Sequence, residues 1–405
     1  MTISGTGVIP YKNNPWDASK VQKLVIEEGV NGIEDGTQYG VDYRGAFAKY
    51  KSLRSVYIPS SVTVIGKFAF YNCTELTEIT LMEGLTSIGA DAFWRAFKNT
   101  GSINIVIPNT VTNIGAGAFA EAGITSVDIP DSVTRIGQKA FADSTVRKIT
   151  IADSDGDLEI NEWAFSNCKS LTEANIPSSV YSIRNNVFYK CTKLTKITIA
   201  EGVDNIADGT RYGVDYHGAF SGCTAIKNIT LPQSLTAVGS YAFYNCNTLK
   251  NITIPSNVET IGNFAFYNCA SMTSVTINKG IESIGESAFA KCTKIKDVYF
   301  SGSSSEWLEI EIGTNNDPLY AAQIHFNSTG PVETEPPVTE KPVPGDVNGS
   351  GAVDAGDATL ILRQVVGAFK LSDEQKAIAD VNGSGAVDAG DATLVLRAVV
   401  GIVKL

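Results

Sequence analysis

The chain has few of the residues that enzymes use for catalysis. Only two histidines, His217 and His325, occur among its 405 residues, and neither lies in a nucleophile or metalloprotease motif such as G-x-S-x-G or H-E-x-x-H. No Gly-rich phosphate-binding loop is present. A glycosidase would need two carboxylates that face each other across a cleft, and the sequence alone leaves such a pair open. These absences favour binding over catalysis.

Clustered positive charge and long apolar runs are also absent. With 32 Lys and Arg against 43 Asp and Glu, the formal net charge is -11, which disfavours a nucleic-acid partner. No apolar run approaches the ~20 residues of a membrane-spanning helix, so no membrane span is expected. The opening residues, MTISGTGVIP, lack the basic and apolar parts of a signal peptide, so an export signal would have to come from elsewhere.

A duplicated segment carries the most specific signal in the chain. Residues 346–367 and 380–401 are identical at 20 of 22 positions, and each begins with oxygen-bearing side chains at loop positions 1, 3, 5, 9 and 12. Calcium collects six to eight oxygens, and a Gly at position 6 lets such a loop turn tightly. The expected calcium ligands, which include the backbone carbonyls of two alanines, are Asp346, Asn348, Ser350, Ala352, Asp354 and Asp357 in the first copy and Asp380, Asn382, Ser384, Ala386, Asp388 and Asp391 in the second.

Each copy reads as a loop followed by a helix, without the entering helix of an EF-hand. The Pro/Thr/Glu segment 327–344 precedes the first loop and is expected to be an extended linker, because Pro breaks helices. Ser at position 5 and Asp at position 12 also depart from the usual EF-hand loop. The exiting helices carry a matching apolar stripe, able to pack one copy on the other, formed by Leu360, Ile361, Val365 and Val366 and by Leu394, Val395, Val399 and Val400. Ser372 and Gln375 form a capping box for a short connecting helix.

Residues 345–405 resemble a type I dockerin, the small all-α module that attaches proteins to the cohesins of a cellulosomal scaffoldin. The resemblance covers both loops, both helices and the spacer. It implies two bound Ca²⁺ ions, a cohesin partner, and a secreted, extracellular, cellulosome-associated protein. The cohesin contacts that it implies are Ala355, Gly356, Leu362 and Arg363, with Ala389, Gly390, Leu396 and Arg397 as their counterparts. Because hydroxyl residues are frequent at the first two positions in that family, the Ala-Gly pairs leave the cohesin class open.

A second repeat governs residues 20–300. An Ala-Phe pair, with Val187 replacing Ala once, recurs with a usual step of 23 residues at Phe47, Phe70, Phe93, Phe119, Phe141, Phe165, Phe188, Phe220, Phe243, Phe266 and Phe289. The frame L-x-x-I-x-I, then V-x-x-I-G-x-x-A-F, predicts stacked units that each contribute a short strand, such as 229–231 or 252–254. The fold class expected is a mostly β solenoid of about eleven coils.

These blocks resemble the BspA-like leucine-rich repeats of bacterial surface and secreted proteins. ISGTG with Pro15-Trp16 looks like that family's N-terminal cap and residues 298–326 look like its C-terminal cap, so the solenoid is expected to span residues 1–326. The outward strand positions form a polar, partly aromatic row that is either ordinary solvated surface or a ligand face: Tyr57, Asp128, Asn175, Thr198, Thr230, Thr253, Thr276 and Tyr299.

The seven cysteines share one position of the repeat, three residues after a Phe. They are Cys73, Cys168, Cys191, Cys223, Cys246, Cys269 and Cys292. A stacked core requires such a column of small inward residues, and the count is odd, so buried free thiols are favoured over disulfides or metal binding.

Two matching insertions interrupt the repeat. DGTQYGVDYRGAF precedes Phe47, and DGTRYGVDYHGAF precedes Phe220, 173 residues later. Their tyrosines, Tyr39, Tyr43, Tyr212 and Tyr216, are possible ligand-loop residues because an aromatic ring offers a large contact area with a polar tip. Duplication of a seven-coil block explains the same match without a function.

The sequence as a whole favours a non-catalytic binding or adhesion protein that a dockerin attaches to a scaffoldin. The ligand of its solenoid, either polysaccharide or protein, is left open. The alternative is a cellulosomal enzyme that acts on plant-wall polysaccharide from the ladder face or the Tyr-rich loops. A calcium-regulated sensor is a weaker third class, because no helix enters the first loop.

Overall fold

The computed structural model describes residues 1–100, 103–213, 215–330, 344–345, 347, 353, 355–366, 371 and 373–404. The expected extended linker lies mostly outside these residues, as do five expected ligands of the first calcium loop and the capping residue Ser372. The chain divides into two compact units, Met1–Gly330 and Pro331–Leu405.

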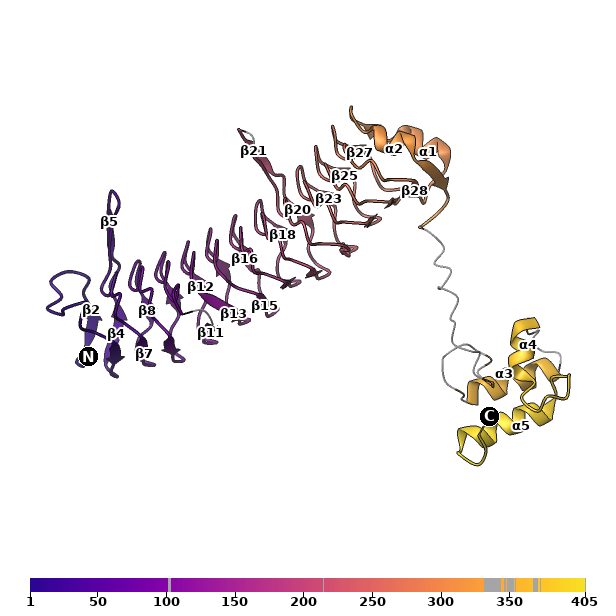
Figure 1. Ribbon diagram of the computed structural model, residues 1–405, viewed down its shortest axis with the longest axis horizontal. Helices are drawn as coiled ribbons and strands as arrows, with labels where there is room; N and C mark the ends of the chain where they lie inside the picture. Colours follow the sequence, from indigo (N-terminus) through magenta and orange to yellow (C-terminus); the bar gives the residue numbers. More distant parts are fainter. Residues whose placement is uncertain are drawn as a thin grey trace. The chain divides into compact units, whose positions relative to one another are not determined.

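The first unit is a solenoid of about 14 turns, which confirms the predicted fold class (Figure 1). Its longer strands stack in parallel into three sheets along one face. Those sheets consist of β1 (Thr2–Ile3), β3 (Lys23–Ile26), β7 (Ser55–Ile58) and β9 (Glu78–Leu81); β11 (Ile103–Val106), β13 (Ile124–Ile129), β15 (Lys148–Ile151), β17 (Glu173–Ile176) and β19 (Lys196–Ile199); and β24 (Asn251–Ile254), β26 (Ser274–Ile277), β28 (Asp297–Phe300) and β30 (Gln323–Phe326).

Short strands form two further parallel sheets on a second face of the coils. They are β2 (Gly7–Ile9), β4 (Val30–Ile33), β8 (Val64–Ile65), β10 (Ser87–Ile88), β12 (Asn113–Ile114), β14 (Arg135–Ile136) and β16 (Glu159–Ile160), then β18 (Ser182–Ile183), β20 (Asn205–Ile206), β23 (Ala237–Val238), β25 (Thr260–Ile261), β27 (Ser283–Ile284) and β29 (Glu311–Ile312). The helices α1 (Ser304–Glu309) and α2 (Asp317–Ala321) lie near β30, at the far end of the coils.

The eleven Phe-bearing coils account for all but three of these turns. The turns that begin at β1, β28 and β30 have no Phe of the repeat, so a count based on Phe alone misses them. In the first turn, Trp16 extends the column, because its ring stacks on Phe47 with centroids 5.7 Å apart. At the other end, Trp307 is buried against Phe300.

The core is a continuous column of stacked rings. Successive Phe rings from Phe47 to Phe289 lie between 5.1 and 5.6 Å apart, and all are fully buried. Along the strands, residues alternate as expected; in β24, for example, Ile252 and Ile254 are buried and Thr253 is exposed. Burial of one such ring stabilises a fold by roughly 3–5 kcal/mol relative to Ala.

One predicted strand is absent. Residues 229–231 form no strand in the structure, and Ile229 is only half-buried, so the ladder of long strands is interrupted between β19 and β24. This coil follows the 32-residue step that contains the second insertion. The prediction of a strand there was wrong because the I-x-I pattern reports which residues face the core, whereas strand pairing also requires the neighbouring coils to be in register.

All seven cysteines are free and buried. Each thiol donates a hydrogen bond to the carbonyl oxygen of a Phe in the preceding coil, for example Cys73 to Phe47 at 3.2 Å and Cys246 to Phe220 at 3.2 Å. Burial raises the pKa of Cys73 and of Cys246 to about 12. The cysteine column is therefore part of the solenoid core.

We expect an aromatic disulfide reagent to modify none of the seven thiols in the folded chain and all seven after denaturation, because the thiolate is the reactive form and burial suppresses it. Absorbance titration before and after addition of guanidinium measures the count. Rapid native modification of even one thiol would show that the column is not sealed.

The described residues of the second unit form three helices: α3 (Ala355–Val365), α4 (Asp373–Ala379) and α5 (Ala389–Val399). Helices α3 and α5 contact each other, and Ile361 and Val395 at their interface are fully buried together with Ala358 and Ala392. The predicted apolar stripe is only partly correct. The valines at its C-terminal end are exposed by 42% (Val365), 74% (Val366), 42% (Val399) and 68% (Val400). Two helices of 11 residues each bury one narrow seam and leave these four valines exposed.

Candidate functional site

The second calcium loop is fully described, and it is held by hydrogen bonds from its own backbone. Asp380 accepts from the N–H groups of Ser384 at 2.9 Å and Gly385 at 2.8 Å, and the Asn382 amide oxygen accepts from Ser384 N–H at 2.7 Å. Gly385 has a φ of 83°, a left-handed conformation that confirms the expected tight turn. The Ala386 carbonyl, an expected ligand, accepts from the Ser384 hydroxyl at 3.0 Å.

The last two expected ligands of this loop also cap helix α5. Asp388 is the N-cap and accepts from Gly390 N–H at 2.6 Å, while Asp391 accepts from Asp388 N–H at 2.9 Å and from Asn382 N–H at 3.1 Å. In the first copy, Asp357 similarly accepts from Val347 N–H at 2.9 Å. Each carboxylate at position 12 therefore ties its loop to its helix.

Asp391 provides the test of whether this loop suits a cation. Its carboxylate is fully buried, and among the described residues no ion pair involves it. A buried carboxylate is costly unless a positive charge compensates it. The donor set of the loop is all oxygen, which suits a hard cation such as Ca²⁺. Within the described ranges no three His, Cys, Asp or Glu side chains converge on one point, so the site depends on amide, hydroxyl and carbonyl oxygens as well.

Five of the eight expected cohesin contacts have described side chains, and all five are exposed. Leu362 is 42% exposed and Leu396 is 43% exposed, and Ala389, Gly390 and Arg397 are also exposed. Ala355, Gly356 and Arg363 lie on α3. Because Val365 and Val399 are exposed to the same extent as these leucines, each helix presents a matching apolar face.

The Tyr-rich insertions form two antiparallel hairpins, β5 (Thr37–Tyr39) with β6 (Asp42–Arg44) and β21 (Thr210–Tyr212) with β22 (Asp215–His217). Both project from the same side of the solenoid (Figure 1). At their tips, Tyr39 is 60% exposed and Tyr212 is 75% exposed.

The other tyrosine of each hairpin folds back onto the coils. Tyr43 stacks on Tyr71 at 4.6 Å, and Tyr71 stacks on Trp94 at 4.6 Å. The second hairpin repeats this arrangement with Tyr216 on Tyr244 at 4.6 Å and Tyr244 on Tyr267 at 5.0 Å. Burial raises the pKa of Tyr71 and of Tyr244 to about 12. Of the four hairpin tyrosines, Tyr39 and Tyr212 are therefore the exposed ones. Tyr43 and Tyr216 each anchor their own hairpin to the coils.

A third aromatic group was not anticipated from the sequence. Trp163 and Tyr189 meet edge to face with centroids 5.5 Å apart, and His217 of β22 packs 4.9 Å from each ring. Burial lowers the pKa of His217. The two rings occupy positions just before and just after a repeat Phe, so reading those two columns for aromatic residues would have found them.

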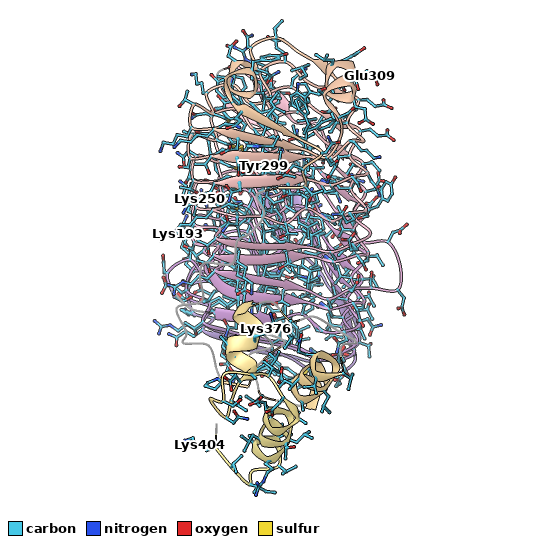
Figure 2. The ribbon with its side chains drawn as sticks, turned by 90° about the vertical axis from the view of Figure 1, so that its right-hand side faces the viewer. Lys193, Lys250, Tyr299, Glu309, Lys376 and Lys404 are labelled. Carbon is cyan, nitrogen blue, oxygen red and sulfur yellow. The ribbon has the colours of Figure 1, made fainter. Side chains whose placement is uncertain are left out.

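The outward row of the ladder is less open than predicted. The Asn175 side chain bonds to the backbone of Ile151, donating to its carbonyl at 2.7 Å and accepting from its N–H at 2.8 Å, and so joins β15 to β17. Thr276 is only 6% exposed because Gly330 lies against it. On β28, the ring of Tyr299, which is labelled in Figure 2, stacks on His325 with centroids 4.7 Å apart, and His325 Nε2 lies 2.8 Å from Asp297 Oδ1.

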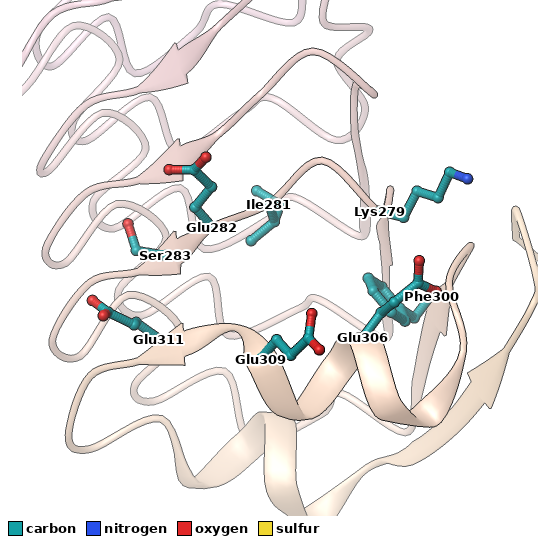
Figure 3. A pocket seen from close by; sticks show the side chains of 8 residues that line it. All are labelled: Lys279, Ile281, Glu282, Ser283, Phe300, Glu306, Glu309 and Glu311. Carbon is teal, nitrogen blue, oxygen red and sulfur yellow. The ribbon is translucent and has the colours of Figure 1, made fainter.

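A half-open, mostly acidic pocket of about 510 Å³, which Lys279 also lines, lies between the last coils and the C-terminal cap (Figure 3). Glu306 and Glu309 of α1 and Glu311 of β29 line it together with Glu282. Ser303 holds Glu306 in a capping box and lowers its pKa. A glycosidase needs one carboxyl with a raised pKa, and Glu306 does not provide it.

Comparisons with known proteins agree with both repeats. Residues 43–96, 94–213 and 216–311 match the BspA type leucine rich repeat region, in 6 copies, and residues 344–400 match the dockerin type I domain. None of the curated proteins matches the chain.

The chain also matches solved structures of bacterial leucine-rich repeat proteins. A leucine-rich repeat protein from Bacteroides ovatus is 20% identical over 73% of this chain and 91% of its own, with a TM-score of 0.51. A leucine rich cell surface protein from Faecalibacterium prausnitzii is 25% identical over 76% of this chain and 93% of its own, with a TM-score of 0.37. A leucine-rich repeat protein from Eubacterium ventriosum is 20% identical over 77% and 79%, with a TM-score of 0.39.

Both matching families are non-catalytic binding modules. Type I dockerins bind calcium and imply a cohesin partner, and proteins that carry them are extracellular components of cellulosomes. Of the helices that the structure describes, none combines the length and the apolar character needed to cross a bilayer. The chain belongs to the family of BspA-type leucine-rich-repeat proteins and carries a type I dockerin domain after its repeats.

Proposed function

We propose that this chain is a non-catalytic binding protein. Its dockerin, loaded with two calcium ions, binds a cohesin of a scaffoldin, and its solenoid binds a ligand. The cohesin contacts are the eight residues expected from the sequence, on α3 and α5. The linker 327–344 separates the two functions.

The matched apolar faces of α3 and α5 carry this proposal. Leu362 with Val365 and Leu396 with Val399 remain about equally exposed in a unit too small to leave such surface open without a partner. Exposed apolar side chains at the centre of a surface are the usual anchors of a protein interface. Calcium holds the loops that precede these helices, so the ion controls the position of both faces.

We propose the absence of catalysis because the two histidines lie apart from each other and each is held by neighbouring side chains. His217 is packed among aromatic rings, and His325 is paired with Asp297 at the other end of the solenoid.

We expect the full chain to be retained by an immobilised type I cohesin in calcium, to be released by excess chelator, and to liberate no reducing sugar from wall polysaccharides in the same tubes. Reducing sugar that rises in proportion to the purified chain would overturn the non-catalytic assignment. Retention that survives chelation would overturn the calcium assignment.

A further inference from the structure

An open pocket lies on the solenoid beside the aromatic corner of Trp163 and Tyr189. Its volume is about 450 Å³, which falls within the range of roughly 300–1,000 Å³ typical of ligand sites. Besides the two rings, the side chains that line it with charge or hydrogen-bonding capacity are Lys139, Asp143, Ser166, Asn167, Lys169, Lys190 and Thr192.

Positive charge gathers here on a chain whose net charge is -11. Lys190 is paired with Asp215 at 3.6 Å, and its ammonium lies 4.8 Å from the centroid of Tyr189. The Lys139 ammonium lies 5.9 Å from the centroid of Trp163. In the described part of the chain, neither Lys139 nor Lys169 takes part in an ion pair, so two exposed ammonium groups are left to meet an anion.

The remaining wall is suited to a sugar ring. Trp163 is half-buried and lines the pocket, and His217 and Tyr189 hold its ring through edge-to-face contacts. Asp143 accepts a hydrogen bond from the Asn167 amide, and their remaining lone pairs and N–H can meet hydroxyl groups. A flat apolar face, hydrogen-bonding groups and free ammonium groups together match a sugar that carries a carboxylate.

We propose that this pocket binds a uronic-acid unit of an acidic polysaccharide, with the sugar ring over Trp163 and its carboxylate toward Lys139 and Lys169. The proposal deepens the proposed function by naming a ligand class for the solenoid. It does not depend on the cohesin, so the two fail separately: loss of cohesin binding with retained uronate binding contradicts only the proposed attachment.

Calorimetric titration of the calcium-loaded full chain with a galacturonic acid trisaccharide, its methyl ester and a glucuronate-containing trisaccharide tests this proposal. Binding of at least one free acid, about tenfold or more tighter than the methyl ester and weakened by added salt, is expected. Equal affinity for the acid and the ester would overturn the proposal. Tighter binding of an oligoglutamate peptide than of the trisaccharides would also overturn it, because that result would assign the pocket to an acidic protein.

Two variants locate the site. Lys139→Gln with Lys169→Gln changes exposed side chains only and should weaken binding of the acid about tenfold without changing the affinity of the ester. Trp163→Asn removes the ring at a position whose φ is 64°, where Asn is tolerated, as Asn186 shows at the corresponding position of the next coil with a φ of 63°. Trp163→Asn should weaken the binding of both the acid and the ester. The control Lys291→Gln removes an ammonium 5.1 Å from Tyr267, outside this pocket, and should have no effect. Unchanged affinity in the lysine pair, or equal loss in the control, would refute the site.

Discussion

A chain with Asp357→Ala and Asp391→Ala is expected to lose cohesin binding by about 1,000-fold or more, equivalent to about 4 kcal/mol. Both carboxylates are fully buried, and each joins a calcium loop to the first turn of the helix that follows. Their removal takes the carboxylate acceptor away from backbone N–H groups of the loops, which costs about 1–3 kcal/mol where the group is buried, and also deletes the expected position-12 ligand of each ion. A small unit has little other burial energy to compensate.

The measurement is a calcium titration by calorimetry, followed by binding to immobilised cohesin. The double variant should take up little calcium and bind no cohesin, while the thermal unfolding of the solenoid stays unchanged, because the solenoid has its own core. Asp131→Ala, a substitution at an exposed site in the solenoid, is the control. A double variant that binds cohesin within tenfold of the original chain would show that neither carboxylate is needed.

The sequence predicts the solenoid well because its repeat reports directly on burial. Every Phe of the repeat is in the core, and the cysteine column lies beside it, since one position of a 23-residue period returns to the same place in each coil. The repeat period does not indicate which coils lack a paired strand. Residues 229–231 keep the apolar pattern and form no strand, and Asn175 uses its side chain where a free outward position was expected.

The candidate pocket escaped prediction for a related reason. Trp163, Tyr189 and His217 are far apart in sequence, and they meet only because stacking places neighbouring coils and a hairpin side by side. In the second unit, the repeat correctly predicted the helices α3 and α5. It did not show that Val365, Val366, Val399 and Val400 stay exposed, because periodicity marks an apolar face without saying how much of that face a short partner helix covers.

Substitution of one apolar face of the second unit is expected to change cohesin affinity only a few fold, whereas substitution of both faces should weaken it by several hundred fold or more. The two copies present nearly equal exposure at each position, 42% and 43% at Leu362 and Leu396 and 42% at both Val365 and Val399. Rotation of the unit by half a turn would then offer a cohesin the same surface, so each face can replace the other. Loss of a buried apolar anchor costs about 2–4 kcal/mol when no alternative face is left.

Leu362→Asp and Leu396→Asp, singly and together, test this by surface binding kinetics. Leucines are better targets than the Ala-Gly pairs, because a Cβ on Gly390 would lie 2.8 Å from the Asp388 carboxylate and would disturb the calcium loop as well as the surface. Thr393→Ala, an exposed change on α5, is the control. If one single variant abolishes binding and the other has no effect, the cohesin uses a single orientation, because only one of the two matched faces then contributes an anchor to the interface.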